Sequence, residues 1–180
     1  MRPLDRLLQR WRIRKALPWV RAGDRLLDIG CYDRSLIDRV GDRVVSAVGV
    51  DVDVAPADDG KVRLLKGRFP DDFSFDPGSF DCVTCLAVLE HVEDPDAFAN
   101  ACHRVLSSGG RAVLTVPHPF VDRILAVLVF LRLIRGMHVE EHHGFEVAET
   151  VPIFQCAGFR LLKRRRFQLG LNHLFVFEKP

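Results

Sequence analysis

A glycine and an aspartate, each at the end of a short apolar segment, are the residues that most clearly suggest a binding site. Gly30 follows the run 25–29, and Asp51 closes the run 44–50. A glycine at the end of a strand permits a tight turn that brings backbone close to a ligand. A carboxylate at the end of another strand can accept hydrogen bonds from both ribose hydroxyls of a nucleoside. Together these positions favour a nucleoside cofactor.

The residues after Gly30 discriminate between two kinds of nucleoside cofactor. A nicotinamide dinucleotide requires Gly-x-Gly-x-x-Gly, because its pyrophosphate needs close approach of backbone amides. This chain reads Gly30-Cys-Tyr-Asp-Arg-Ser, without a second or third glycine. The sequence therefore disfavours a nicotinamide oxidoreductase, which stays the weaker alternative and is tested by dinucleotide binding.

Two histidines are candidates for base catalysis. His118 directly follows the apolar run 111–116, and His142 lies in the histidine- and glutamate-rich run 138–143. An imidazole titrates near neutral pH, so either could take a proton from a nucleophile. The run 138–143 lacks the regular Cys/His spacing of a zinc site, so it favours a polar pocket wall or a solvated loop, and we expect no metal.

Five cysteines, at 31, 82, 85, 102 and 156, include one Cys-x-x-Cys pair. Cys82 and Cys85 lie within the predicted strand 80–86, where a separation of three places the thiols on opposite faces. That geometry is unsuited to metal or redox chemistry. The odd count, without a secretion signal, predicts reduced thiols and a cytoplasmic protein.

The elements that must position these residues alternate between strand and helix. The early strands are nearly continuous apolar runs, which is typical of a parallel sheet covered on both faces. The chain of 180 residues suits one domain, 1–180. We therefore predict a doubly wound, Rossmann-like α/β fold with a mostly parallel seven-stranded sheet. Its last strand, 172–178, is predicted to be antiparallel and to form a hairpin with 159–168 across Gly170.

The two ends of the chain are basic and the centre is acidic. Net charge is +2 overall, made up of +6 over residues 1–25, +5 over 160–180 and −9 between them. An acidic centre is a poor footprint for nucleic acid and suits a cationic or polar small molecule. We therefore expect a small-molecule substrate and no nucleic-acid partner.

Three segments bear on contact with lipid. Residues 1–20 are predicted to hold an amphipathic helix with Leu4, Leu7, Leu8 and Trp11 on one face and arginines on the other. The predicted helix 120–135 is apolar all round, so it is buried, covers an apolar substrate or dips into a membrane interface. With the basic run 163–166, peripheral contact with anionic lipid is an alternative to a solvated edge strand. Oligomeric state is left open.

Several motifs, in this order, give the chain a family resemblance. They are Leu26-Leu-Asp-Ile-Gly-Cys, Val48-Gly-Val-Asp, Ser79-Phe-Asp-Cys-Val-Thr-Cys-Leu-Ala-Val-Leu-Glu-His-Val, Asp94-Pro, Arg104-Val-Leu-Ser-Ser-Gly-Gly, Thr115-Val-Pro-His-Pro and Ala157-Gly-Phe. Over roughly 25–180 the chain resembles the class I S-adenosylmethionine-dependent methyltransferases, specifically the small bacterial group acting on small molecules. The resemblance implies a Rossmann-like fold, S-adenosylmethionine as cofactor and methyl transfer as activity.

The resemblance also implies which residues hold the cofactor. The implied site comprises Asp28, Gly30, Tyr32, Asp51, Val52, Phe69, Leu86, Ala87 and His91. Asp28 and Gly30 match the motif beside the methionine part and the ribose, and Asp51 matches the acid that holds the ribose hydroxyls. Residues 66–69 take the place of the adenine loop. Glu90 and His91 match a Glu-His pair that either contacts ligand or orients the loop.

Two positions depart from the family pattern. Tyr32 and Arg34 replace the later glycines of Gly-Cys-Gly-x-Gly, and Gly67-Arg-Phe-Pro replaces the acid that often follows the third strand. Asp71 or Asp72 is the nearest substitute for that acid. These departures define a second hypothesis, a degenerate non-catalytic binding module.

The substrate side is predicted from the segment after the fifth strand. Methyltransferases acting on base amino groups typically place Asn/Asp-Pro-Pro-Tyr/Phe after the fourth strand, whereas Leu86 here begins Leu-Ala-Val-Leu-Glu. We expect the segment 118–145 to form one wall of the acceptor pocket, because it follows the edge toward which the donor methyl should point. Its composition favours an acceptor with an apolar body and one polar reactive group. His118 or His142 is expected nearest the nucleophile.

Overall fold

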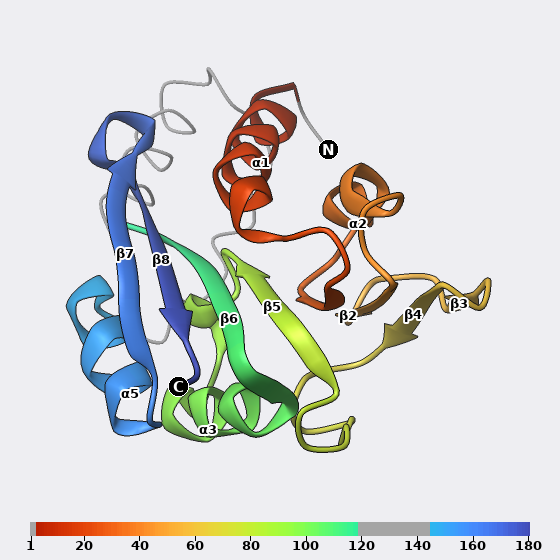
Figure 1. Cartoon of the computed structure of the whole chain (residues 1–180). Helices are drawn as coiled ribbons and strands as arrows, with labels where there is room; N and C mark the ends of the chain where they lie inside the picture. Colours follow the sequence, from red (N-terminus) through yellow and green to blue (C-terminus); the bar gives the residue numbers. More distant parts are fainter. Residues whose placement is uncertain (1–2, 119–144) are drawn as a thin grey trace.

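The computed structural model describes residues 3–118 and 145–180, and these form a twisted sheet with helices on both faces (Figure 1). The sheet has eight strands in the order β3-β4-β2-β1-β5-β6-β8-β7. The strands are β1 (Arg25–Ile29), β2 (Ser46–Asp51), β3 (Ala57–Asp58), β4 (Val62–Lys66), β5 (Phe80–Leu86), β6 (Leu106–Pro117), β7 (Arg160–Phe167) and β8 (Asn172–Glu178). The helices are α1 (Pro3–Ala16), α2 (Ser35–Val40), α3 (Pro95–Val105) and α5 (Thr150–Cys156), with the 3-10 turns η1 (Leu17–Trp19), η2 (Leu89–His91), η3 (Val147–Glu149) and η4 (Gln168–Gly170).

Strand directions agree with the doubly wound, Rossmann-like prediction. Strands β4, β2, β1, β5 and β6 are parallel, so their carboxyl ends share one edge of the sheet. Strand β8 lies between β6 and β7 and is antiparallel to both. The predicted antiparallel last strand and the hairpin are therefore confirmed.

The eighth strand is a difference from the predicted seven. The two residues of β3 pair antiparallel with Arg63 and Leu64 of β4. Asp59 closes the turn by accepting hydrogen bonds from the backbone N–H groups of Lys61 and Val62 at 3.0 and 2.7 Å. Both residues of β3 are exposed, so the strand carries no apolar pattern from which it could be predicted.

The two faces of the sheet carry separate apolar cores. Helices α3 and α5 cover a core rich in phenylalanine, whereas α1 and α2 cover a core of aliphatic residues. Cys85 belongs to the first core and Cys82 to the second, so the predicted placement on opposite faces is confirmed. Burial raises the pKa of the Cys82 thiol to about 12, so it is protonated and unreactive at neutral pH.

A helix forms in the predicted N-terminal segment, but two residues of its predicted apolar stripe face outward. Helix α1 packs on the sheet through Ile13 and Ala16, which are almost fully buried. Leu7 and Trp11 of the predicted stripe are 58% and 38% exposed. Apolar spacing at i, i+3 and i+4 marks a stripe on a helix, but the fit to the sheet decides which side of the helix is buried.

Some expectations concern residues outside the described ranges. The predicted helix 120–135, the run 138–143 with His142, and nearly all of the predicted pocket wall 118–145 lie there. In residues 3–118 and 145–180, no helix is long and apolar enough to span a bilayer.

Candidate cofactor and active site

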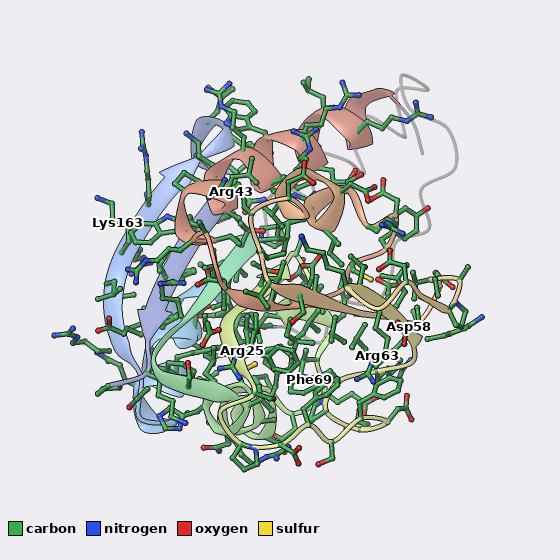
Figure 2. The ribbon with its side chains drawn as sticks, turned by 45° about the vertical axis from the view of Figure 1, so that its right-hand side comes forward. Arg25, Arg43, Asp58, Arg63, Phe69 and Lys163 are labelled. Atoms are coloured by element: carbon green, nitrogen blue, oxygen red, sulfur yellow. The ribbon has the colours of Figure 1, made fainter. Side chains whose placement is uncertain are left out.

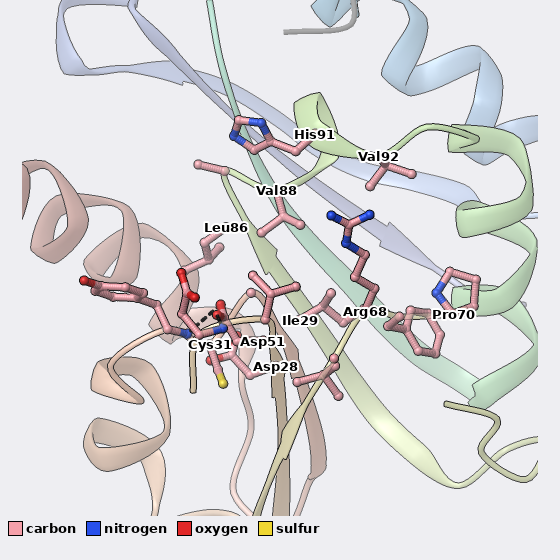
Figure 3. A pocket seen from close by; sticks show the side chains of 18 of the residues that line it. Asp28, Ile29, Cys31, Asp51, Arg68, Pro70, Leu86, Val88, His91 and Val92 are labelled. Carbon is pink, nitrogen blue, oxygen red and sulfur yellow. Dashed lines mark hydrogen bonds between the residues drawn. The ribbon is translucent and has the colours of Figure 1, made fainter. Parts of the chain in front are cut away.

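A cavity of about 950 Å³ opens at the carboxyl ends of β1, β2, β4 and β5 (Figure 3). Its lining includes all nine residues of the predicted cofactor site, Asp28, Gly30, Tyr32, Asp51, Val52, Phe69, Leu86, Ala87 and His91. They meet there because the ends of parallel strands share an edge, although up to 63 positions separate them in sequence. Their binding role stays a prediction.

Gly30 permits the close approach of two loops at the base of the cavity. Its φ is +74°, and its backbone N–H donates to the Val50 carbonyl at 2.8 Å. A Cβ atom at this position would lie 2.1 Å from Cγ2 of Val88, in the loop after β5. Any side chain here would therefore have to push aside the side chain of Val88 and would also be strained by the positive φ.

Both oxygens of the Asp51 carboxylate are held by backbone. Oδ2 accepts from the N–H of Tyr32 at 2.9 Å, and Oδ1 accepts from the N–H of Asp53 at 2.8 Å (Figure 3). Each oxygen keeps a further lone pair, which is the acceptor geometry that a ribose diol requires. Within the described residues no ion pair involves Asp51.

The two replaced glycines keep a glycine-like backbone. Tyr32 and Arg34 have φ of +43° and +54°, so both lie in the left-handed region. This conformation costs roughly 1 kcal/mol or more for a non-glycine residue. Nε of Arg34 donates to Asp38 at 2.8 Å, whereas Tyr32 borders the cavity with 48% of its surface exposed. Neither side chain closes the cavity.

Asp28 is a buried carboxyl group at the inner wall of the cavity. The hydroxyl of Thr84 donates to its Oδ1 at 2.6 Å. Burial raises the pKa of Asp28 to about 7; the Thr84 hydrogen bond opposes the rise, and the charges of Asp51 and Asp33 add to it. A cation placed beside this group would favour its ionised form, so the position suits the positively charged end of a ligand.

The loop after β4 resolves which acid can substitute at the adenine position. Oδ2 of Asp72 accepts from the backbone N–H of Arg68 at 2.7 Å, so it caps its own loop. Asp71 lines the cavity and Asp72 does not, which leaves Asp71 as the candidate acceptor. Figure 3 shows the Arg68 side chain extending toward Val92.

The end of β5 and the loop that follows it form another wall of the cavity. Ala87 has φ of +61°, and its N–H donates to the carbonyl of Thr115 in β6 at 2.8 Å. The following turn η2 separates the Glu-His pair, because Glu90 is buried outside the cavity lining whereas His91 is exposed and lines it. Of the pair, only His91 is therefore placed to meet a ligand.

The predicted base His118 lies at the same edge but outside the cavity lining. Its backbone N–H donates to the Leu171 carbonyl at 2.9 Å, and its ring stacks on that of His173 with centroids 5.9 Å apart. His173 is buried, and burial followed by the charges of Arg164 and Arg166 lowers its pKa to about 4. His142 lies outside the described residues, so its position relative to His118 stays a prediction.

Sequence reasoning missed the residues that α1 contributes. Gln9, Arg12 and Ile13 line the cavity from the N-terminal helix. Gln9 also donates to Oδ1 of Asp33 at 2.8 Å, which ties the helix to the turn after β1. Gln9 and Arg12 lie on the same side of α1 as the buried Ala16, a signal visible only once the buried side is known.

A model of the family described as "Methyltransferase domain" matches residues 2–163. Among curated relatives, a ubiquinone biosynthesis O-methyltransferase of Pseudomonas aeruginosa (strain LESB58) is 33% identical over 131 residues, covering 65% of this chain and 56% of that protein. The chain thus spans just over half the length of such relatives.

Solved structures give the same fold at low identity. One is a complex between the Haloferax volcanii Trm112 methyltransferase activator and a methyltransferase, with TM-score 0.74, 19% identity and coverage of 94% of this chain and 90% of that chain. Another is an S-adenosylmethionine-dependent methyltransferase from Mesorhizobium loti, with TM-score 0.71, 19% identity and coverage of 92% and 95%.

The chain therefore belongs to the methyltransferase-domain family, and the predicted class of S-adenosylmethionine-dependent methyltransferases is confirmed. The methyl donor of this class is S-adenosylmethionine, and the cavity fits it. Asp51 offers two oxygens for the ribose, Asp28 is a buried carboxyl without an ion pair among the described residues, and Gly30 lets the turn after β1 pack directly against Val88 at the base of the cavity. The nicotinamide alternative has no support from these relatives.

Proposed function

We propose that this chain transfers the methyl group of S-adenosylmethionine to a hydroxyl oxygen of a small acceptor with an apolar body, in the cytoplasm and without a nucleic-acid partner. The observation that carries the proposal is Asp51, which lines the cavity at the end of β2 and whose two oxygens each accept one backbone hydrogen bond and retain a further lone pair. Oxygen is favoured because curated relatives carry the name ubiquinone biosynthesis O-methyltransferase.

The main contribution of the protein to methyl transfer would be to position the cofactor and the acceptor. The bound cofactor supplies an activated methyl group, and transfer is an in-line displacement whose rate depends on orientation. Asp51 would hold the ribose, Asp71 the adenine amine and Asp28 the cationic methionine end. Leu86 and Ala87 would border the sulfonium.

Transfer to a hydroxyl releases its proton, which a base must take, whereas an acceptor that arrives as an oxyanion needs no base. His118 and His142 remain the predicted groups for that step. Among the described histidines His91 lines the cavity itself, so it joins them as a candidate. A His91→Gln variant should reduce turnover while cofactor affinity changes less than tenfold, if His91 is the base.

Calorimetric titration with S-adenosylmethionine and its demethylated product tests the cofactor. We expect saturable heat with both ligands. Absence of heat and of a thermal shift at millimolar concentration would refute cofactor binding. A transfer assay with labelled methyl donor and a panel of lipophilic phenols tests the acceptor.

The second hypothesis, a non-catalytic binding module, rests on Tyr32 and Arg34, which stand where the family has glycines. It predicts cofactor binding that is weak or absent in a folded protein, with no methylated product across the panel. Methylation of any phenol would exclude it. The predicted contact with a membrane surface also stays a proposal.

A further inference from the structure

The outward side of α1 exposes large apolar side chains. Leu7 and Trp11 are 58% and 38% exposed, and Leu169, at the tip of the β7–β8 hairpin, is 97% exposed. The hairpin tip adjoins α1, because Nε2 of Gln168 donates to the backbone carbonyl of Leu8 at 3.0 Å. Exposed apolar residues of this size thus gather on two neighbouring elements.

A groove beside this apolar stripe concentrates positive charge. It lies between α1 and α2, has a volume of about 440 Å³ and is lined by Arg6, Gln9, Arg10, Tyr32, Asp33, Ser35 and Arg39. Its three guanidinium groups make no ion pair within the described residues. Asp33, its one carboxylate, already accepts hydrogen bonds from Gln9 and from the N–H of Ser35. The groove is therefore a net cationic site.

Strand β7 carries further positive charge along the hairpin, away from its tip. Lys163 and Arg165 pair with Val176 and Leu174 of β8, which belong to the core beneath α1, so they lie on the face of the sheet that α1 covers. Both are exposed. Figure 2 shows Lys163 projecting from the edge of the molecule.

We propose that the outward face of α1, the arginine groove and the hairpin tip form a docking surface for an anionic phospholipid bilayer. Apolar side chains that include a tryptophan, flanked by cations, are the composition of a helix lying in a membrane interface. A protein partner of ordinary composition would not require, beside the stripe, three arginines that make no ion pair with any described residue. Charge complementarity therefore selects anionic headgroups as the occupant.

The position of α1 links this surface to the cofactor cavity. The inner side of the helix, through Gln9, Arg12 and Ile13, lines the cavity, and Tyr32 borders both the cavity and the groove. A bilayer against α1 would thus lie beside the cavity mouth. This placement would let an apolar acceptor pass from lipid to the site without crossing water, an inference that rests on the proposed function.

Vesicle co-sedimentation tests the proposal, with phosphatidylcholine vesicles prepared with and without phosphatidylglycerol. We expect binding to the anionic vesicles and much weaker binding to the neutral ones. Arg6→Gln/Arg10→Gln/Arg39→Gln should reduce partitioning roughly a hundredfold, because each basic residue near an anionic surface contributes roughly fivefold. Leu7→Gln/Trp11→Gln should reduce it at least tenfold.

A matched control replaces an exposed apolar residue elsewhere. Val45, in the segment between α2 and β2, is 63% exposed, and Val45→Gln should leave vesicle binding unchanged. None of the substituted residues lines the cofactor cavity, so titration with S-adenosylmethionine reports folding independently. That titration also separates failure of this proposal from failure of the proposed function.

Two outcomes would overturn the proposal. One is binding to anionic vesicles that is absent, or equal for the wild type and the α1 variants. The other is a change of oligomeric state, in sedimentation velocity, when Leu7 and Trp11 are replaced while vesicle binding is retained. The second outcome would assign the apolar stripe to contact between copies of the chain.

Discussion

Acidic residues at the two ends of the parallel strands differ in their partners among the described residues: those at the amino edge form ion pairs, and those at the carboxyl edge do not. At the amino edge Asp24 accepts from Nη2 of Arg111 at 2.7 and 2.6 Å, and both side chains are buried. Beside them Asp81 accepts from the guanidinium of Arg25 at 2.8 and 2.9 Å. At the carboxyl edge, within the described residues, Asp28 and Asp51 are held only by hydroxyl or backbone donors and form no ion pair.

This contrast separates residues that hold the fold from residues left for a ligand. The hydrogen bonds from Arg25 hold the pKa of Asp81 well below its usual range, whereas burial raises the pKa of Asp28 to about 7. A carboxylate that already has a cationic partner adds little to the binding of a ligand, whereas one without such a partner can form a new ion pair or hydrogen bonds with it. Carboxyl groups at the two edges should therefore respond differently to substitution.

The largest effect is expected at the buried pair of the amino edge. Arg111→Met should lower the free energy of unfolding by about 3–5 kcal/mol, because Asp24 would stay buried without its cation. Urea denaturation measures the loss. Affinity of the folded protein for S-adenosylmethionine should not change. A loss under 1 kcal/mol would mean that water replaces the arginine, and Asp24→Leu/Arg111→Met should recover part of the stability.

Next in size is the effect of Asp51 on the cofactor. Asp51→Ala should weaken binding of S-adenosylmethionine at least tenfold, since hydrogen bonds to a charged acceptor contribute roughly 1.5–3 kcal/mol each. The matched control Asp81→Ala, at the opposite edge, should leave affinity unchanged. Calorimetric titration measures both. Equal affinities for the wild type and Asp51→Ala would place the ribose elsewhere.

Asp28 should make both stability and binding depend on pH. Its pKa is raised above the unfolded value, so the folded state holds the extra proton and stability falls as pH rises toward about 7. Asp28→Asn removes this titration. The free energy of unfolding of the variant, relative to that of the wild type, should therefore rise by up to roughly 1.4 kcal/mol per pH unit between pH 5 and about 7. Denaturation over a pH series measures this difference, and a flat difference would refute it.

The Asp28 carboxyl should also make cofactor affinity depend on pH. A cationic ligand beside Asp28 favours the ionised carboxyl, so affinity for S-adenosylmethionine should rise as pH passes through about 7. Asp28→Asn should abolish the rise. An unchanged pH profile in the variant would assign the titration to another group.

The smallest effect is expected at the half-exposed pair of the amino edge. Asp81→Asn should lower the free energy of unfolding by about 1 kcal/mol at pH 7, because solvent screens the interaction with Arg25. The pKa of Asp81 is lowered by folding, so this contribution is present at neutral pH and is lost as pH falls below about 3.8. Denaturation at pH 7 and in acid should show the difference between wild type and variant shrinking.

The strand pattern of the sequence predicted the carboxyl edge of the sheet with Gly30 and Asp51 on it, and the family resemblance named the nine residues that meet there. Apolar runs ending at Ile29, Val50 and Leu86 mark buried parallel strands, and the ends of such strands must share an edge. Local chemistry therefore sufficed to bring Gly30 and Asp51 into one cavity. The family motifs added Phe69 and His91, which follow strands by too many residues for spacing alone to place them.

Only the tertiary structure decided what enters that edge from elsewhere in the chain. Helix α1 turns Gln9 and Arg12 into the cavity and Leu7 outward, a choice that apolar periodicity leaves open. Likewise, Asp71 faces the cavity while Asp72 caps its loop. These outcomes depend on how side chains from distant segments pack, and a local pattern specifies a face of a helix without specifying its neighbour.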